Sequence, residues 1–373
     1  MHKLDGVGEL GRYRSVSLIS DISTLADQAD ARHVGLEAGS ELVDAVERAR
    51  ASLSVTNLEA ARLLPHTRPT VLLSHLREQS AGATLGQMPR TRLIFVSGKG
   101  GTGKSAVAAA IAIDHARRGR RVLAIDMIGS RGLAAHLRAT SLTYRPTEVR
   151  AGLFAMEMNR SDALDEYLKL QLHVPQGAPT RPISQALSVL ADTAPGVREI
   201  ISIGKPIYET WKNVWDIVVV DASSLGLFQS YLRAPRTIAR LVSTGGVARQ
   251  AAELEGTLTD PGVTATYLVA TPAELPVIET AEAITAIDRE SLGPRPTVII
   301  NRFIPRSGLT ERDLEHLGSG ALRDAAALQL GLEKDQARWI TSLDHDVRLP
   351  YLFGVHTPGE VAIKLADEIK VPL

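Results

Sequence analysis

The pattern of apolar and polar positions changes near residue 90. Before that point, apolar residues recur at helical spacing within short segments that are interrupted by glycine, proline and serine. This predicts short helices at about 22–32, 37–51, 57–64 and 71–78. Residues 79–89 have the composition of a linker. We therefore predict a helical N-terminal extension with a linker over residues 1–90, whose role in packing or partner binding the sequence leaves open.

From residue 91 onward, short apolar runs alternate with longer stretches of helical periodicity. The strands predicted from these runs are 92–97, 121–126, 215–221, 265–270, 297–301 and 338–341. Near-continuous apolar strands that alternate with helices are typical of a parallel sheet covered on both faces. We therefore predict an α/β fold over 91–373, with a doubly wound, mainly parallel sheet and a mainly helical insertion at about 159–213.

Two helix starts carry the sequence of a capping box. Thr271 and Glu274 flank Pro272, and Thr357 and Glu360 flank Pro358. Both positions are predicted to begin a helix.

Composition excludes several classes of function. Lysine plus arginine and aspartate plus glutamate both number 42, so a surface built for nucleic acid is not expected. The chain has no cysteine, which excludes disulfides, thiolate metal sites and cysteine nucleophiles. No apolar run is long enough to cross a membrane. We expect a cytoplasmic protein without an integral membrane segment.

One segment carries most of the chemical information. It follows the pattern G-x-x-x-x-G-K-[ST] of a phosphate-binding loop, and its residues are Gly98, Lys99, Gly100, Gly101, Thr102, Gly103, Lys104 and Ser105. An apolar strand precedes it and an alanine-rich, helix-favouring stretch follows it, as this motif requires. Backbone N–H groups and the helix N-terminus would bind phosphates. Lys104 would lie along the β- and γ-phosphates, and the Ser105 hydroxyl would be a Mg²⁺ ligand.

Two aspartates end predicted strands of the same sheet. Ligands in such sheets bind at the carboxyl ends of strands, so Asp126 and Asp221 should face the loop. Asp221 follows four apolar residues and would hold Mg²⁺ through water. Asp126 would orient or deprotonate the attacking water. The alternative for each is a carboxylate that only caps a helix or stabilises a loop.

The loop also resembles the deviant Walker A motif, KGGxGK[ST], of the SIMIBI-class ATPases, which include MinD, ParA, the nitrogenase iron protein and the ArsA/Get3 family. Segments 219–235, 269–283 and 298–305 are similar to elements of ArsA-like proteins, and segment 194–205 resembles the helical insert of their bacterial, especially actinobacterial, branch. The resemblance implies ATP or ADP with Mg²⁺, and a homodimer or a heterodimer with a related ATPase. It also implies that Lys99 reaches the partner's nucleotide as a catalytic residue and that Asn301 reads adenine.

The sequence departs from the family pattern at three places. Ala106 stands where a hydroxyl residue is usual, and the loops after Asp126 and Asp221 read Met-Ile-Gly-Ser and Ala-Ser-Ser. Hydrolysis is therefore expected to be slow or to need a partner. The cysteines that bind arsenite in ArsA are absent, which argues against arsenite transport.

Three functions remain open from the sequence. The first is an ATP-driven dimeric switch of the ArsA/Get3 type that binds or delivers a client protein, with membrane proteins among the candidates. The second is a spatial organiser like MinD or ParA, although the last predicted helix carries two lysines against three acids and lacks a basic membrane-binding face. The third is a nucleotide-gated scaffold with little turnover.

Overall fold

The computed structural model describes residues 92–172, 196–242 and 244–369. The chain divides into two compact units, of which one comprises residues 91–163, 196–240 and 248–373 and contains the sheet. The other comprises 1–90, 164–195 and 241–247, and only short pieces of it belong to the described residues. The helices predicted in residues 1–90 lie outside the described residues, so the N-terminal extension stays a prediction.

An eight-stranded sheet forms the centre of the larger unit, in the order β3-β4-β2-β5-β1-β6-β7-β8. Only the β3–β4 pair at one edge is antiparallel. The strands are β1 (Arg92–Gly98), β2 (Val122–Asp126), β3 (Thr147–Arg150), β4 (Leu153–Glu157), β5 (Ile217–Asp221), β6 (Thr264–Ala270), β7 (Thr297–Phe303) and β8 (Val347–Pro350). The predicted α/β fold with a mainly parallel sheet is confirmed.

The described helices connect these strands. They are α4 (Lys104–Arg117), α5 (Gly132–His136), α6 (Arg160–Leu172), α8 (Val197–Trp211), α9 (Leu225–Leu241), α10 (Gly245–Thr259), α11 (Glu274–Arg289), α12 (Glu311–His316), α13 (Ala321–Ile340) and α14 (Pro358–Glu368). No helix among the described ranges is long and apolar enough to span a bilayer. Within the predicted insertion 159–213, α6 and α8 are helical, residues 173–195 lie outside the described part, and the insertion stays a prediction.

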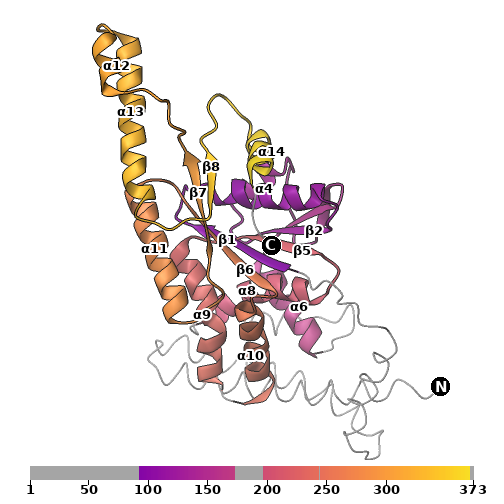
Figure 1. The fold of residues 1–373 in the computed structure, drawn as a ribbon. Coiled ribbons are helices and arrows are strands. Elements are labelled where there is room, and N and C mark those ends of the chain that lie inside the picture. Colours follow the sequence, from indigo (N-terminus) through magenta and orange to yellow (C-terminus); the bar gives the residue numbers. More distant parts are fainter. Residues whose placement is uncertain (1–91, 173–195, 243, 370–373) are drawn as a thin grey trace, which may run out of the picture. The chain divides into compact units, whose positions relative to one another are not determined.

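Alternating strand residues build two apolar cores, one on each face of the sheet. In β1, Ile94 and Val96 pack with α4, α5 and α14, whereas Leu93 and Phe95 pack with α8, α9 and α11. Figure 1 shows α4 and α14 together on one side of the strands and α8 to α11 on the other. This arrangement is the doubly wound one, because each parallel crossover returns over one face.

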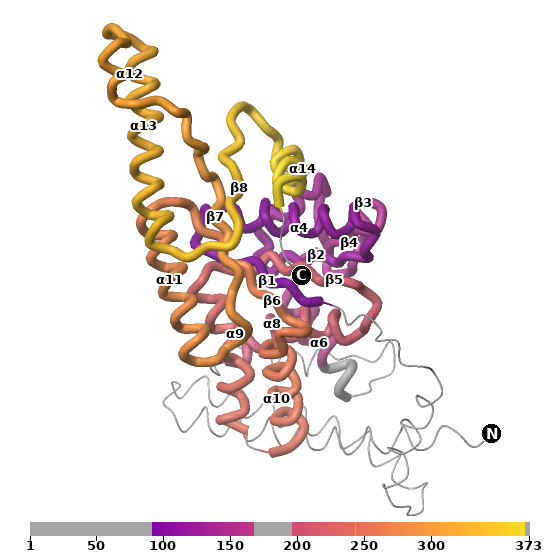
Figure 2. Tube along the Cα trace, viewed as in Figure 1, coloured from indigo at the N-terminus to yellow at the C-terminus, as the bar shows by residue number. Residues whose placement is uncertain are grey.

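A third apolar cluster lies towards the β7–β8 edge, where α11 and α13 cover β6 and β7. Its members include Val277 of α11 and Ile340 of α13. Figure 2 shows α12 and the first turns of α13 extending beyond the ends of β7 and β8. The end of α13, at Trp339 and Ile340, therefore belongs to this packed layer.

One predicted strand was wrong, and the strands β3 and β4 were missed. Residues 338–341 were predicted as a strand, but they end α13, and the edge strand is Val347–Pro350. Leu330, Gln336 and Ile340 are buried on one side of α13, so tertiary packing at helical spacing outweighs the β-favouring Trp-Ile-Thr sequence. Strands β3 and β4 were not predicted; β3 has no buried residue that would have given an apolar signal.

The two predicted helix starts had different outcomes. At α14, the Thr357 hydroxyl accepts from the backbone of Glu360 and the Glu360 carboxylate accepts in return, so the capping box is confirmed. At α11, the N-cap is Ala273 and no side chain caps the helix, so the capping box with Thr271 was wrong.

Candidate functional site

The predicted phosphate-binding loop lies between β1 and α4. Gly98 ends the strand, and Lys104 and Ser105 are the first residues of the helix. The carbonyl of Lys99 accepts the Thr102 hydroxyl at 2.9 Å and the Lys104 ammonium at 3.2 Å. These bonds close the loop on itself above the helix N-terminus. The unpaired N–H groups of that terminus form a site suited to an anion.

Two glycines of the loop are required by their surroundings. A Cβ on Gly98 would lie 2.2 Å from the Val269 carbonyl oxygen of β6, which is backbone and has no freedom to move aside. Gly103 has φ +94°, a left-handed conformation that side chains disfavour. A Cβ there would also lie 2.4 Å from the Asn301 amide nitrogen. The strand register and Asn301 therefore fix both positions as glycine.

Asn301 of β7 contacts the loop directly. Its side-chain nitrogen donates to the carbonyl of Thr102 at 2.8 Å, and the residue is 4 % exposed. The Asn301 amide nitrogen is thus engaged with the loop backbone. The position agrees with a nucleotide-site residue, and the adenine-reading role stays a prediction.

Replacing Asn301 with alanine is expected to weaken binding of ATP and of inorganic triphosphate alike, each by about 5- to 150-fold. The reason is that a buried loop carbonyl loses its donor, at about 1–3 kcal/mol. Calorimetric titration with both ligands measures the effect, since triphosphate has no base. Weakened ATP binding with unchanged triphosphate binding would instead identify Asn301 as a reader of the base only.

The two predicted carboxylates lie side by side. Asp126 ends β2 and Asp221 ends β5, and they are register partners on adjacent parallel strands. Both are 0 % exposed. One oxygen of Asp126 accepts from the backbone N–H groups of Ile128 and Gly129 at 2.8 and 2.9 Å. Its other oxygen and both oxygens of Asp221 lack a hydrogen bond of normal geometry. Buried carboxylate oxygens without partners are what a hydrated cation would satisfy.

Burial and charge perturb the protonation of these groups. Burial raises the pKa of Asp221 to about 7; the nearby Ser105 hydroxyl lowers it, the Asp126 charge raises it and the Lys104 charge lowers it. Burial also raises the pKa of Asp126, against the two backbone N–H donors. Burial lowers the pKa of Lys104, while the charge of Asp221 raises it. Shifted pairs of this kind are typical of functional sites.

The raised pKa of Asp221 predicts a pH dependence of Mg²⁺–nucleotide binding. Below pH about 7 the carboxyl is mostly protonated and must lose its proton to serve a cation, so affinity should fall about tenfold per pH unit below 7 and level off above it. Calorimetry with Mg²⁺ and ADP between pH 5.5 and about 8.5 tests this. In Asp221→Asn, the pH dependence of affinity that comes from Asp221 should disappear. The pH dependence that comes from the titration of ADP itself should remain.

The same shift has a defined consequence for stability. Between the ordinary value of 3.8 and about 7, the folded chain holds a proton at Asp221 that the unfolded chain has lost. The free energy of unfolding of the ligand-free protein should therefore fall as pH rises through this range, as far as Asp221 is concerned.

A cation site built from protein groups alone is absent from the described part of the chain: no three histidine, aspartate or glutamate side chains converge there. The groups that could hold Mg²⁺ are the Ser105 hydroxyl and, through water, Asp221. Mg²⁺ commonly keeps several waters and takes its remaining ligands from phosphates. The donor set therefore fits Mg²⁺ that arrives with a nucleotide.

Sequence reasoning missed one residue of the site. The Lys99 ammonium forms an ion pair with Glu279, which lies on α11. Glu279 is 180 residues away along the chain, and only the packing of α11 beside the loop brings the two together. The segment 269–283 was singled out by resemblance, but nothing in it assigns a contact to this glutamate.

The structure brings every predicted site residue to one end of the strands. The loop residues 98–105, Asn301, Asp126 and Asp221 are contributed by strands β1, β7, β2 and β5 and by helix α4. The arrangement brings together a helix N-terminus suited to an anion, the buried Lys104 ammonium and two buried carboxyl groups. These are the parts that phosphoryl transfer to water needs.

Comparisons with known proteins agree with this chemistry. The profile of a family described as anion-transporting ATPases matches residues 91–249. ATPase BagA of Mycobacterium tuberculosis is 35 % identical over 271 residues, which cover 68 % of this chain and 77 % of that protein. A proposed arsenical pump-driving ATPase of Halobacterium salinarum is 26 % identical over 57 % of this chain and 36 % of its own length. ATPase GET3 of Podospora anserina is 25 % identical over 148 residues, which cover 39 % of this chain and 44 % of that protein.

Proposed function

The chain belongs to the family of anion-transporting ATPases, also called the ArsA family, and from that premise we propose that it is an ATP-hydrolysing dimeric switch. In this proposal, Mg²⁺–ATP binds at the loop 98–105, and two copies close on each other around the nucleotides. Closure and hydrolysis would then control the binding or delivery of a client protein.

The observation that best supports nucleotide binding is the pair of buried carboxyl groups, Asp126 and Asp221, beside the loop. Three of their four carboxylate oxygens are buried without a hydrogen-bond partner. That arrangement is costly unless a bound group completes it. In the proposal, Ser105 and Asp221 hold Mg²⁺, Lys104 contacts the β- and γ-phosphates, and Asp126 positions the attacking water.

The dimer is supported by features of α11. Leu275 and Ile278 are 59 % and 41 % exposed, and they lie within one turn of Glu279. The Lys99 side chain is 30 % exposed and leaves the loop rather than folding over it. An exposed cation next to an apolar helix face fits a surface that a second copy would cover. A single phosphate-binding loop per chain also requires a second chain for a composite site.

The alternative of a spatial organiser receives no support from the last helix. Ala362, Leu365 and Ala366 of α14 are buried in the core that also contains α4. The apolar face of α14 is therefore already used within the chain, whereas a membrane-binding helix needs that face free.

Two measurements test the proposal on the purified full chain: the molar mass by light scattering with and without Mg²⁺–ATP, and the release of phosphate. An ATP-dependent doubling of mass together with turnover is expected. A monomer at saturating ATP would contradict the dimeric switch. A dimer without phosphate release would favour the nucleotide-gated scaffold.

Asp126→Asn is expected to lower turnover by about 10²-fold or more, while ATP binding and the dimer persist. The asparagine oxygen can still accept from Ile128 and Gly129, so the loop keeps its geometry. The amide, however, cannot take a proton from water. Asp288→Asn, at an exposed position of α11, is the matched control. Unchanged turnover in Asp126→Asn would remove this residue from the mechanism.

A further inference from the structure

Lys99, the lysine assigned to the partner's nucleotide, is occupied within its own chain by the carboxylate of Glu279. We propose that Glu279 is a positioning residue that holds the Lys99 ammonium in its own chain until a nucleotide bound by a second copy takes it over. This inference rests on the proposed dimeric switch and adds a residue to it. We refer to the Lys99–Glu279 contact as the latch.

The backbone carbonyl and the side chain of Lys99 make separate contacts. Its carbonyl is fixed, because Thr102 and Lys104 both donate to it. Its side chain takes no part in this bonding and reaches out to α11. The ammonium can therefore move between two anions without any change in the loop backbone that cradles the phosphates. Lys104 has no such freedom, since it is 9 % exposed and lies next to Asp221.

Exposure makes the latch easy to open. The side chains of Lys99 and Glu279 are 30 % and 37 % exposed. Ion pairs this exposed to water contribute little to stability. The polyphosphate of a nucleotide carries several negative charges, whereas Glu279 carries one. The Lys99 ammonium would therefore bind the polyphosphate in preference to Glu279 once a second copy brings its nucleotide close. The ion pair thus orients the Lys99 side chain, and its small energy lets the ammonium leave Glu279 for a nucleotide phosphate.

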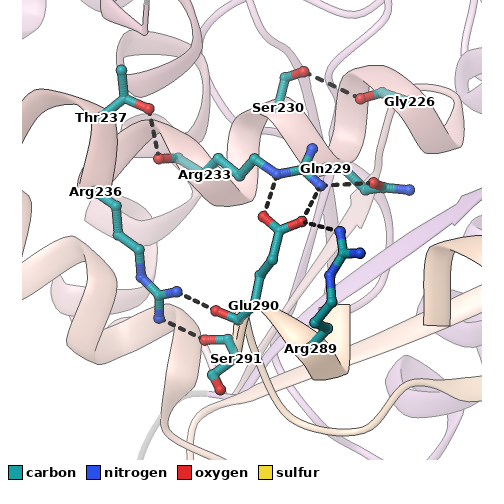
Figure 3. A network of polar contacts seen from close by, with 9 residues as sticks. All are labelled: Gly226, Gln229, Ser230, Arg233, Arg236, Thr237, Arg289, Glu290 and Ser291. Atoms are coloured by element: carbon teal, nitrogen blue, oxygen red, sulfur yellow. Dashed lines mark hydrogen bonds and ion pairs between the residues drawn. The ribbon is translucent and has the colours of Figure 1, made fainter. Parts of the chain in front are cut away.

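Helix α11, which bears Glu279, is held to α9 by polar contacts at its C-terminal end. Beyond the last turn of α11, Glu290 accepts two hydrogen bonds from Arg233 of α9, at 2.6 and 2.9 Å. Arg236 of α9 donates to the carbonyls of Glu290 and Ser291 (Figure 3). Because α9 follows Asp221 by only a short loop, Glu279 and the predicted metal ligand are held on connected elements.

The test compares Glu279→Gln with wild type. The glutamine keeps the size of the side chain and removes its charge. Glu282→Gln, one turn further along α11 at an exposed position, is the matched control. In Glu279→Gln, half-maximal dimer formation by light scattering should need an ATP concentration about two- to fivefold lower, the range that an exposed ion pair can supply. Glu282→Gln should match wild type.

A second readout needs no ATP. Acylation of Lys99 by an amine-reactive ester, followed by mass spectrometry with the exposed Lys364 as internal reference, should be faster in Glu279→Gln. In the Lys99→Ala background, Glu279→Gln should leave the dependence of molar mass on ATP the same as in Lys99→Ala alone. Wild-type behaviour of Glu279→Gln in either readout overturns the latch.

The two readouts separate the latch from the proposed function. If wild type never dimerises with ATP, the switch is wrong, and faster acylation of Lys99 in Glu279→Gln still shows the hold on Lys99. If wild type dimerises but the midpoint or the acylation rate does not respond to Glu279→Gln, the switch stands and the latch fails.

Discussion

Lys104→Ala is expected to lower the affinity for ATP by at least about 30-fold. In the proposed site, Lys104 contacts the β- and γ-phosphates from a position that is 9 % exposed. Removing one member of a buried charge pair costs about 2–5 kcal/mol, which corresponds to about 30- to several-thousand-fold in affinity. Isothermal titration calorimetry with Mg²⁺–ATP measures the loss directly.

The fold should survive this substitution. Lys104 is the first residue of α4, where alanine is a good helix former. Burial lowers the pKa of Lys104, because the folded chain disfavours its charge, and removing this charge offsets the loss of its hydrogen bond to the Lys99 carbonyl. The thermal midpoint without ligand is expected to stay level or rise, while the increase that ATP causes in wild type disappears. Lys364→Ala, at an exposed position of α14, is the control. Micromolar affinity retained by Lys104→Ala would refute the phosphate-binding loop.

Lys99→Ala is expected to leave ATP affinity within about threefold of wild type and to abolish ATP-dependent dimerisation or lower turnover by on the order of 10³-fold. The affinity persists because the side chain leaves the loop towards Glu279 and does not enter the cradle of its own chain. The turnover falls because a cation supplied by a second chain stabilises the charge that develops on the transferred phosphoryl group, an effect worth about 10³ to 10⁵.

A mixing experiment tests whether Lys99 acts across the dimer. The Lys99→Ala chain keeps its ATP site but has no lysine to offer, and the Lys104→Ala chain has lost its ATP site but keeps Lys99. In a mixed dimer, Lys99 of the second chain can reach the nucleotide of the first. Phosphate release above the sum of the separate variants is therefore expected. A mixture no more active than that sum would argue against a role across the dimer.

The amino-acid sequence determined the chemistry of the loop and the order of the elements around it. The spacing of Gly98, Gly103, Lys104 and Ser105 is local information, because a glycine turn between a strand and a helix is encoded by adjacent residues. Asp126 and Asp221 were identifiable because each ends an apolar run and strand ends of a parallel sheet share one edge. The capping box at Thr357 was equally local.

Where tertiary packing competes with local preference, the sequence was misleading. The run Arg338–Thr341 has β-favouring residues, yet α13 continues through it because Ile340 packs on the β6–β7 side of the sheet. The hydroxyl of Thr271 does not cap α11, whose N-cap is Ala273. In both cases the energy of burial over a long helix exceeds the small preference of a few residues.

Only the tertiary structure decided which groups meet at the loop. The donor of Asn301 reaches the Thr102 carbonyl from 199 residues away, and Glu279 reaches Lys99 from 180 residues away. No local pattern encodes either contact, since each depends on where β7 and α11 pack against β6 in the finished sheet. The raised pKa of Asp221 has the same origin, because desolvation exists only once the surrounding layers are closed. The sequence by itself thus determined the phosphate-binding motif and the family of this chain, and the fold decided which residues contact Lys99 and the loop.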